Sequence, residues 1–257
     1  MTSDFTVSNA YDSRSFPIPA AVRPLYLFDS DAQLKQHVDY VAAKAGDAAS
    51  ALRLVSELAL SEIFAQRDRF PKDCVFVAPH AEEASGDNAI PQVLAEVTAI
   101  VAGATSDKEI VQSTKVYHTG ADPMERLISR PRFEGSVTTG ARYVLIDDVT
   151  SLGGTLAELA HFVQKHGGIV HDVFVLVNAG RNKAFTPDRA VARKLEERFP
   201  YELNEIFGIE IAALTANEAQ YLVGFRSADE IRNRVVKAGK EIDLRLRAKG
   251  IFRHGRS

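Results

Sequence analysis

Residues 144–155 have the sequence VLIDDVTSLGGT, and this stretch decides the fold of the chain. It overlaps an apolar run, Arg142 to Ile146, that is typical of a strand buried on both faces of a parallel sheet. Apolar residues at helical spacing then predict a helix over Thr155 to His166. A second apolar run predicts the next strand over Ile169 to Asn178. Because strand, helix and strand with short connections form a parallel crossover, we expect an open, mostly parallel α/β sheet flanked by helices.

The preceding part of the chain is expected to add further elements to this sheet. The short apolar run Cys74 to Ala78 predicts another buried strand, and a helix ending near Ala102 is expected to follow it. A second short strand is expected at about Glu109 to Tyr117. It leads into His118 to Ala141, a stretch rich in glycine and proline that predicts a long loop of functional interest.

These patterns divide the chain into three parts. Residues 1–71 combine a polar, proline-containing arm with strong helix formers and are expected to form a hood or a packing segment. Residues 72–180 form the α/β core. Residues 181–257 form a C-terminal extension that completes the domain and ends in a basic helical tail.

Composition excludes several classes of protein. The chain has 257 residues, 46% hydrophobic and 25% charged, with a net charge of −3, which is typical of a globular protein. The single cysteine, Cys74, excludes an internal disulfide framework and a multi-cysteine zinc site. His161 and His166 diverge on the predicted helix and are expected at the surface rather than at a metal. No apolar run approaches the ~20 residues that cross a bilayer, so we expect a cytoplasmic protein without membrane contact.

Two adjacent acids, Asp147 and Asp148, stand where the buried strand ends. Open α/β sheets bind ligands at this edge, and neighbouring like charges need a cation or hydroxyl donors. The turn that follows opens a helix, so its backbone N–H groups, its hydroxyls and the helix dipole would converge on an anion. Gly153 and Gly154 allow the backbone to approach that anion closely. These features predict a sugar phosphate ligand; the plainer alternative is an ordinary crossover turn whose acids face solvent.

At these residues the sequence resembles the type I phosphoribosyltransferases, whose signature is a strand, two acids and a Gly-Thr-containing phosphate loop. The match covers about Val144 to Gly168, and the order of strands and helices from Lys72 to Asn178 is compatible with it. Leu152 stands where many members have Thr or Ala, a departure that backbone-mediated phosphate binding should tolerate. In this family the signature binds 5-phosphoribosyl 1-pyrophosphate (PRPP).

The resemblance implies transfer of 5-phosphoribose from Mg-PRPP to a nitrogenous base, the acceptor, with release of pyrophosphate. Asp147 and Asp148 would bind the ribose hydroxyls and stabilise positive charge on the sugar ring. Mg²⁺ would be held mainly by the substrate, with the same two acids as its contacts on the protein. The ribose and its 5-phosphate would also be bound by Thr150, Ser151, Leu152, Gly153, Gly154 and Thr155. We expect a homodimer.

Family members use a loop after their first strand to hold pyrophosphate, and here Pro79 to Asn88 occupies that place. His80 and Ala81 are the candidates for the pyrophosphate side. The loop departs from the expected pattern because it carries three acids, Glu82, Glu83 and Asp87. Either a glutamate faces a Mg²⁺ ion, or the acids lie at a solvated helix start.

Family members also close a long mobile loop over the site, and His118 to Ala141 occupies its place. Cations brought down by such a loop would neutralise pyrophosphate and exclude water. We expect catalytic roles for Arg126 and Arg130, and pyrophosphate contacts for Arg132 and for Lys115 at the base of the loop. The alternative for each arginine is a solvated surface side chain.

Two further groups of cations follow the core. Arg181 and Lys183 come after the strand ending at Asn178 and are expected on the acceptor side of the site. The tail from Arg232 to Ser257 carries a net charge of +7. Its pattern predicts a helix with an apolar and a basic side, packed on the domain or on a second subunit, or bound to RNA or DNA. An alternative function is therefore a PRPP-sensing regulatory or nucleic-acid-binding protein without efficient transferase activity.

Overall fold

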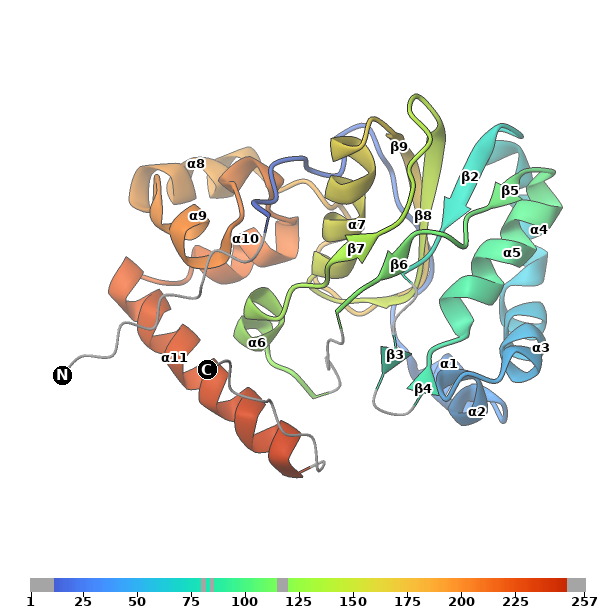
Figure 1. Ribbon diagram of the computed structural model, residues 1–257, viewed down its shortest axis with the longest axis horizontal. Coiled ribbons are helices and arrows are strands. Elements are labelled where there is room, and N and C mark those ends of the chain that lie inside the picture. The colour runs from blue at the N-terminus through green and yellow to red at the C-terminus, as the bar shows by residue number, and fades with distance from the viewer. Residues whose placement is uncertain (1–11, 80–81, 84–85, 115–119, 249–257) are drawn as a thin grey trace.

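The computed structural model of the chain describes residues 12–79, 82–83, 86–114 and 120–248. Its centre is a sheet of five strands, all parallel, in the order β1-β9-β8-β2-β5 (Figure 1). The strands are β1 (Leu25–Phe28), β2 (Cys74–Val77), β5 (Thr105–Ser106), β8 (Arg142–Thr150) and β9 (Ile169–Asn178). The open parallel α/β fold expected from the sequence is confirmed.

Helices precede, separate and follow these strands. The N-terminal helices are α1 (Ala32–Gln36), α2 (Tyr40–Lys44), α3 (Ala48–Leu58) and α4 (Leu60–Ala65), with a 3-10 turn at Arg67–Arg69. Strands are connected by α5 (Ile90–Ala102), α6 (Pro123–Ile128) and α7 (Gly154–Lys165). The C-terminal helices are α8 (Arg189–Arg198), α9 (Glu202–Phe207), α10 (Ala216–Leu222) and α11 (Ala228–Ala248), with a 3-10 turn at Ile211–Ala213. Over the described ranges, no helix combines the length and the apolar character needed to cross a membrane.

Helices cover both faces of the sheet, which explains the continuous apolar run in β8. Val144 and Ile146 lie in a core shared with α3 and α5. Leu145 points to the other face and lies in a second core shared with α7. Figure 1 shows α7 on one side of the sheet and α3, α4 and α5 on the other. The predicted crossover of strand, helix and strand is therefore formed by β8, α7 and β9.

The C-terminal helices form a third core with α6, beside the sheet (Figure 1). Its fully buried members include Leu203, Leu222 and Ile231. Capping boxes begin two of the helices: Asp122 caps α6 and Thr215 caps α10, each together with a glutamate three residues later. The start of α10 lies close to the end of β8, because Thr215 also contacts Leu152.

The strand expected at about Glu109 to Tyr117 is formed in part, by β6 (Val111–Gln112), and it does not join the main sheet; residues 115–117 lie outside the described residues. The strand that joins the main sheet is β5, and β6 pairs instead with β7 (Phe133–Glu134), beyond α6, in a separate two-stranded antiparallel sheet. The reason is a local turn, because the Asp107 carboxylate accepts hydrogen bonds from the N–H groups of Glu109 and Ile110, both at 2.8 Å. The stretch His118 to Ala141 is likewise not one long loop, since it contains α6 and β7.

The edge strand β1 was not expected from the sequence. It pairs in parallel with β9, so a strand of the main sheet lies inside residues 1–71, the segment expected to flank the core. An antiparallel hairpin, β3 (Glu82–Glu83) with β4 (Gly86–Asp87), lies in the loop after β2. Figure 1 places this hairpin and helices α1 and α2 beyond the edge of the sheet where β2 and β8 end.

Candidate functional site

The acid pair lies inside the last part of β8, at the carboxyl edge of the sheet. Asp147 is in register with Val175 of β9, and Thr150 at the end of β8 is in register with Asn178 at the end of β9. Asp147 and Asp148 are only 9% and 3% exposed, so neither is a solvated surface acid. This placement disagrees with the plainer alternative, in which the acids of an ordinary turn face solvent.

Asp148 is held by groups from two other parts of the chain. The Nζ atom of Lys44, the last residue of α2, lies 2.9 Å from Asp148 Oδ2. Asn88 Nδ2 donates to the same oxygen at 3.2 Å, and the N–H of Val149 donates to Oδ1 at 2.9 Å. Burial alone would raise the pKa of Asp148, but the Lys44 ammonium and these donors outweigh it and hold that pKa below its ordinary value. These contacts favour the ionised form of Asp148.

The pKa of Asp147 is shifted in the opposite direction. Burial, and then the negative charge of Asp148, raise the pKa of Asp147 well above its ordinary value. The N–H of Asp148 donates to Asp147 Oδ1 at 2.9 Å. Each of the two carboxyls can accept a hydrogen bond from a hydroxyl. Such a pair suits the two neighbouring hydroxyl groups of a sugar.

The turn after the acid pair has the backbone that its glycines suggest. Gly153 has a φ of +81° and forms the N-cap of α7. A Cβ atom at this position would lie 2.7 Å from the Phe185 ring, so both conformation and packing require glycine. The first N–H groups of α7 have no acceptor within the helix, and Ser151, Leu152 and Thr155 are partly exposed beside them. The turn can therefore accept an anion from solvent.

The start of helix α10 is hydrogen-bonded to this turn. Thr215 Oγ1 donates to the carbonyl oxygen of Leu152 at 2.5 Å, and Asn217 Nδ2 donates to that of Ser151 at 2.9 Å. Two carbonyl groups of the turn are thereby bound to the C-terminal helices. Thr215 and Asn217 lie more than sixty positions from the turn in sequence. The capping box that begins α10 is the one sequence signal that could have drawn attention to them.

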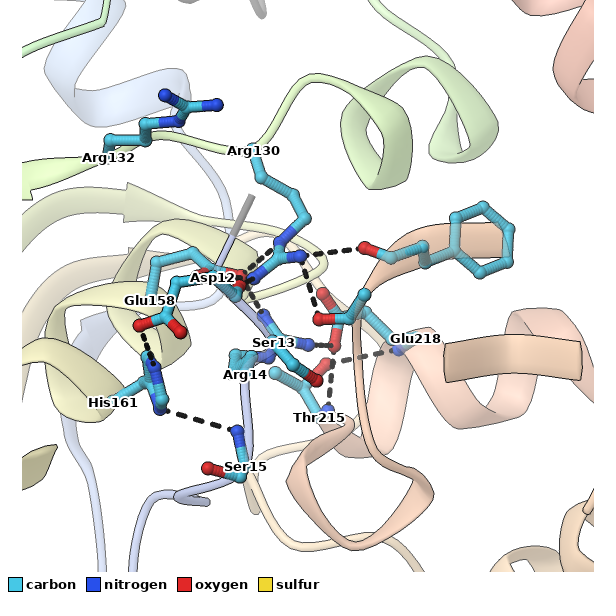
Figure 2. A network of polar contacts seen from close by, with 12 residues as sticks. Asp12, Ser13, Arg14, Ser15, Arg130, Arg132, Glu158, His161, Thr215 and Glu218 are labelled. Atoms are coloured by element: carbon cyan, nitrogen blue, oxygen red, sulfur yellow. Dashed lines mark hydrogen bonds and ion pairs between the residues drawn. The ribbon is translucent and has the colours of Figure 1, made fainter. Parts of the chain in front are cut away.

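A buried ionic network lies next to these contacts (Figure 2). Arg14 is fully buried and donates to Glu158 Oε1 of α7 at 3.0 Å and to Glu218 of α10. Arg130 donates to both oxygens of Glu158, at 2.6 and 2.9 Å, and to the carbonyl oxygen of Phe207 at 2.7 Å. Glu218 in turn accepts from the N–H of Thr215. The network joins residues 12–16, called here the N-terminal strap, to α7, α10 and the segment after α6.

The structure thus places Arg130 away from the solvent, unlike the expected loop cation, and its catalytic role stays a prediction. Its side chain is 5% exposed and its guanidinium is bound to Glu158 and to backbone carbonyls, so it is fixed in the protein interior instead of in a mobile loop. The reason is that Glu158, one turn into α7, is buried and requires cationic partners.

The other cations expected around pyrophosphate have different positions. Arg126 lies in α6, where its Nε donates to the carbonyl oxygen of Ala121 at 3.0 Å. Arg132 directly precedes β7, and its N–H donates to Thr114 Oγ1. Figure 2 shows its side chain apart from the ionic network. The catalytic role of Arg126 and the pyrophosphate contact of Arg132 stay predictions.

Several predicted residues cannot be placed at the site. His80, Ala81 and Lys115 lie outside the described residues. Glu82, Glu83 and Asp87 are in the hairpin of β3 and β4, of which the backbone is described. Both interpretations of these acids, as Mg²⁺ contacts or as solvated groups, therefore stay predictions.

The segment expected on the acceptor side follows β9 at the same edge. Arg181 and Lys183 are exposed there, and Lys183 Nζ lies 3.0 Å from Asp29 Oδ1 after β1. Between them, the N–H of Asn182 donates to Asn217 Oδ1 at 3.0 Å. Asn217 therefore contacts both this segment and the turn before α7, residues 151–154, here called the phosphate turn after its expected ligand.

His161 is buried, contrary to the expected surface position. It is 6% exposed, and its Nδ1 accepts from the N–H groups of Ser15 and Phe16, both at 3.3 Å (Figure 2). Burial lowers its pKa, so the neutral ring can accept these bonds and hold the N-terminal strap on α7. His166 is exposed, as expected.

The described part of the basic tail is the helix α11, and it packs on α6. Ile231, Ala238, Ile242 and Leu246 lie on its buried side. Arg234 pairs with Asp122, and Arg245 pairs with Glu125, so two of its cations are neutralised by α6. These contacts agree with the expectation of a helix packed on the domain. RNA or DNA binding by the tail stays a prediction.

A resident metal cage is not found in the described ranges, where no group of three or more His, Cys, Asp and Glu side chains is placed to bind an ion. The two carboxyls of Asp147 and Asp148 are what a Mg²⁺ ion bound mainly through substrate phosphates would need, because Mg²⁺ usually takes one or two carboxylates with phosphate and water oxygens. The site therefore fits Mg²⁺ that arrives with a ligand.

Comparisons with known proteins find a longer relative that matches most of this chain and an enzyme that matches a short stretch of it. No known family profile matches the chain. Protein TraN of Escherichia coli is 35% identical over 221 residues, which are 84% of this chain and 49% of TraN. The chain thus spans about half the length of this relative. Orotate phosphoribosyltransferase of Methanothermobacter thermautotrophicus is 40% identical over 45 residues, 18% of this chain and 25% of that enzyme. Among solved structures, adenine phosphoribosyltransferase from Leishmania donovani has a TM-score of 0.35 at 16% identity, over 76% of this chain and 87% of that protein.

Proposed function

We propose that the chain binds Mg-PRPP at the carboxyl end of β8 and transfers its phosphoribosyl group to a nitrogenous base, with release of pyrophosphate. One observation carries this proposal: a buried pair of acids, Asp147 and Asp148, is followed directly by a left-handed glycine turn at Gly153 that opens α7. The pair suits a sugar diol and the turn suits its phosphate. The short similarity to an orotate phosphoribosyltransferase supports the same class of reaction.

In this proposal, the turn and the acid pair bind different parts of PRPP. The N–H groups at the start of α7 bind the 5-phosphate, which fixes the ribose over the end of β8. Asp147 and Asp148 bind the ribose hydroxyls, and the charge of Asp148 stabilises the positive ring as the bond from C1 to pyrophosphate breaks and the bond to the base nitrogen forms. Asp147 and Asp148 would hold a Mg²⁺ ion that arrives with the substrate, and such an ion would supply positive charge against the leaving pyrophosphate.

A second candidate function is a PRPP-sensing regulatory protein that has lost efficient transfer. One observation favours it: Arg130, the arginine expected to act on pyrophosphate, is buried in the network around Glu158. A protein that binds PRPP through the acid pair and turn, without cations on the leaving group, would respond to the ligand and turn it over slowly. Both candidates use the same ribose and phosphate contacts.

One experiment separates the two candidates. Pyrophosphate release is measured from Mg-PRPP with the purified chain and a panel of purine and pyrimidine bases, alongside direct binding of PRPP. Release that depends on one base supports the transferase and identifies its acceptor. PRPP binding without release across the panel supports the sensor, and absence of binding refutes both.

A further inference from the structure

Helix α2 brings a lysine to the acid pair from the N-terminal part of the chain. Lys44 ends this helix, and its Nζ lies 2.9 Å from Asp148 Oδ2. Tyr40, four residues earlier, lies on the same side of the helix. Burial raises the pKa of Tyr40, and the charges of Lys44 and Asp148 both act on its hydroxyl. The side of α2 that carries these two residues therefore faces the end of β8.

The backbone around Lys44 is held in place, while its side chain is partly exposed. The N–H of Ala89 donates to the carbonyl oxygen of Ala43 at 3.1 Å, which ties α2 to the start of α5. The Lys44 side chain is 22% exposed, against 5% for Asp148. A lysine has a flexible stem of four carbons, so its ammonium can move without displacing the helix.

Lys44 occupies the oxygen that a ribose would need. Asp148 Oδ2 is bound by both Lys44 and Asn88, and Oδ1 is bound by the N–H of Val149. A sugar hydroxyl that binds Asp148 must share or replace these contacts. The anionic groups of the same ligand would at that moment offer the ammonium a new partner.

We propose that Lys44 is the cation that binds the pyrophosphate group of PRPP, and that it moves there from Asp148 when the ribose hydroxyls bind. This inference rests on the proposed function. The exchange keeps both charges compensated, because Asp148 gains hydroxyl donors as Lys44 gains phosphate oxygens. Lys44 would thereby take the role that sequence analysis assigned to Arg130. On the leaving group, it neutralises the charge that develops as the bond to C1 breaks.

The test compares ligands that share the ribose phosphate and differ in the pyrophosphate. Binding of Mg-PRPP and of ribose 5-phosphate is measured by calorimetry for the full chain and for Lys44→Met, Lys44→Arg and Lys35→Met. We expect Lys44→Met to weaken PRPP binding about tenfold or more, as for the loss of a charge-assisted hydrogen bond, and to leave ribose 5-phosphate within about twofold of wild type. Lys44→Arg keeps the cation and should retain most of the PRPP affinity.

Lys35→Met is the matched control, because Lys35 is an exposed lysine of α1 that pairs with Asp31. It should bind both ligands as wild type does. Equal loss of both ligands in Lys44→Met would overturn the inference, since Lys44 would then only organise Asp148. Unchanged binding of both would also overturn it. Failure of the wild-type chain to bind either ligand would instead reject the proposed function itself.

Discussion

Replacement of Arg14 by methionine tests whether the buried network holds the N-terminal strap and the phosphate turn together. Arg14 has no exposed surface and pairs with two carboxylates, those of Glu158 and Glu218, which are themselves 6% and 2% exposed. Methionine fills a similar length without charge. The variant therefore leaves Glu158 and Glu218 buried with fewer hydrogen-bond donors, and methionine supplies no donor in return.

The magnitude follows from what each acid retains. Removal of one member of a buried ion pair costs about 3–5 kcal/mol, because it leaves an uncompensated charge. Glu158 keeps Arg130, and Glu218 keeps the N–H of Thr215, so the lower end of the range applies. We expect a loss of about 3 kcal/mol in the free energy of unfolding. For a chain of this size that corresponds to a fall in Tm of roughly 6–12 °C.

Urea unfolding followed by circular dichroism measures this loss. The control is Arg53→Met, which removes an exposed arginine paired with Asp39 and should unfold close to wild type. Adding Glu218→Gln to Arg14→Met should recover part of the stability, because the acid left unpaired is then neutral. If Arg14→Met unfolds like Arg53→Met, the network does not stabilise the fold and the reasoning is refuted.

Three further predictions concern the site. Gly153→Ala should lower the thermal stability and the PRPP affinity more than Gly140→Ala does. Both glycines have positive φ, but only a Cβ added at position 153 would meet the Phe185 ring. Equal shifts in Tm for the two variants would refute the packing argument. Because burial raises the pKa of folded Asp147 above its ordinary 3.8, the stability of wild type relative to Asp147→Asn should fall as pH rises from that value toward the raised pKa; a difference between the two that stays constant with pH would contradict this. Arg130→Met should lower the free energy of unfolding by about 3 kcal/mol in chemical denaturation, and a variant that keeps wild-type stability but loses turnover would restore the catalytic role expected from the sequence.

The fold around the acid pair could be predicted because its signals are local. The apolar run of β8, the two acids, the glycine turn and the periodicity of α7 follow one another within a short stretch of chain. Each of them is set by contacts between neighbours or by simple periodicity. β1 escaped prediction because it has four half-buried residues beside a proline-containing arm, and its position depends on pairing with the distant β9.

The cations of the site could not be assigned from sequence, because their partners are far apart along the chain. Arg130 is fixed by Glu158 and by the carbonyl oxygen of Phe207, 28 and 77 positions away. Lys44 contacts Asp148 across a separation of more than one hundred residues, and no motif in the sequence links the two. Sequence pattern identifies the residue types of a site better than it identifies which arginine or lysine arrives there.

The central claim, that the acid pair and the glycine turn bind a ribose phosphate, is tested most directly by calorimetric binding of Mg-PRPP to wild type and to the Asp147→Asn, Asp148→Asn double variant. The substitutions preserve shape and remove the charged acceptor, so circular dichroism should match wild type. We predict that the wild-type chain binds PRPP and that the double variant binds it about a hundredfold more weakly, the effect of losing two strong hydrogen bonds. Wild-type affinity in the double variant would contradict the assignment of the site.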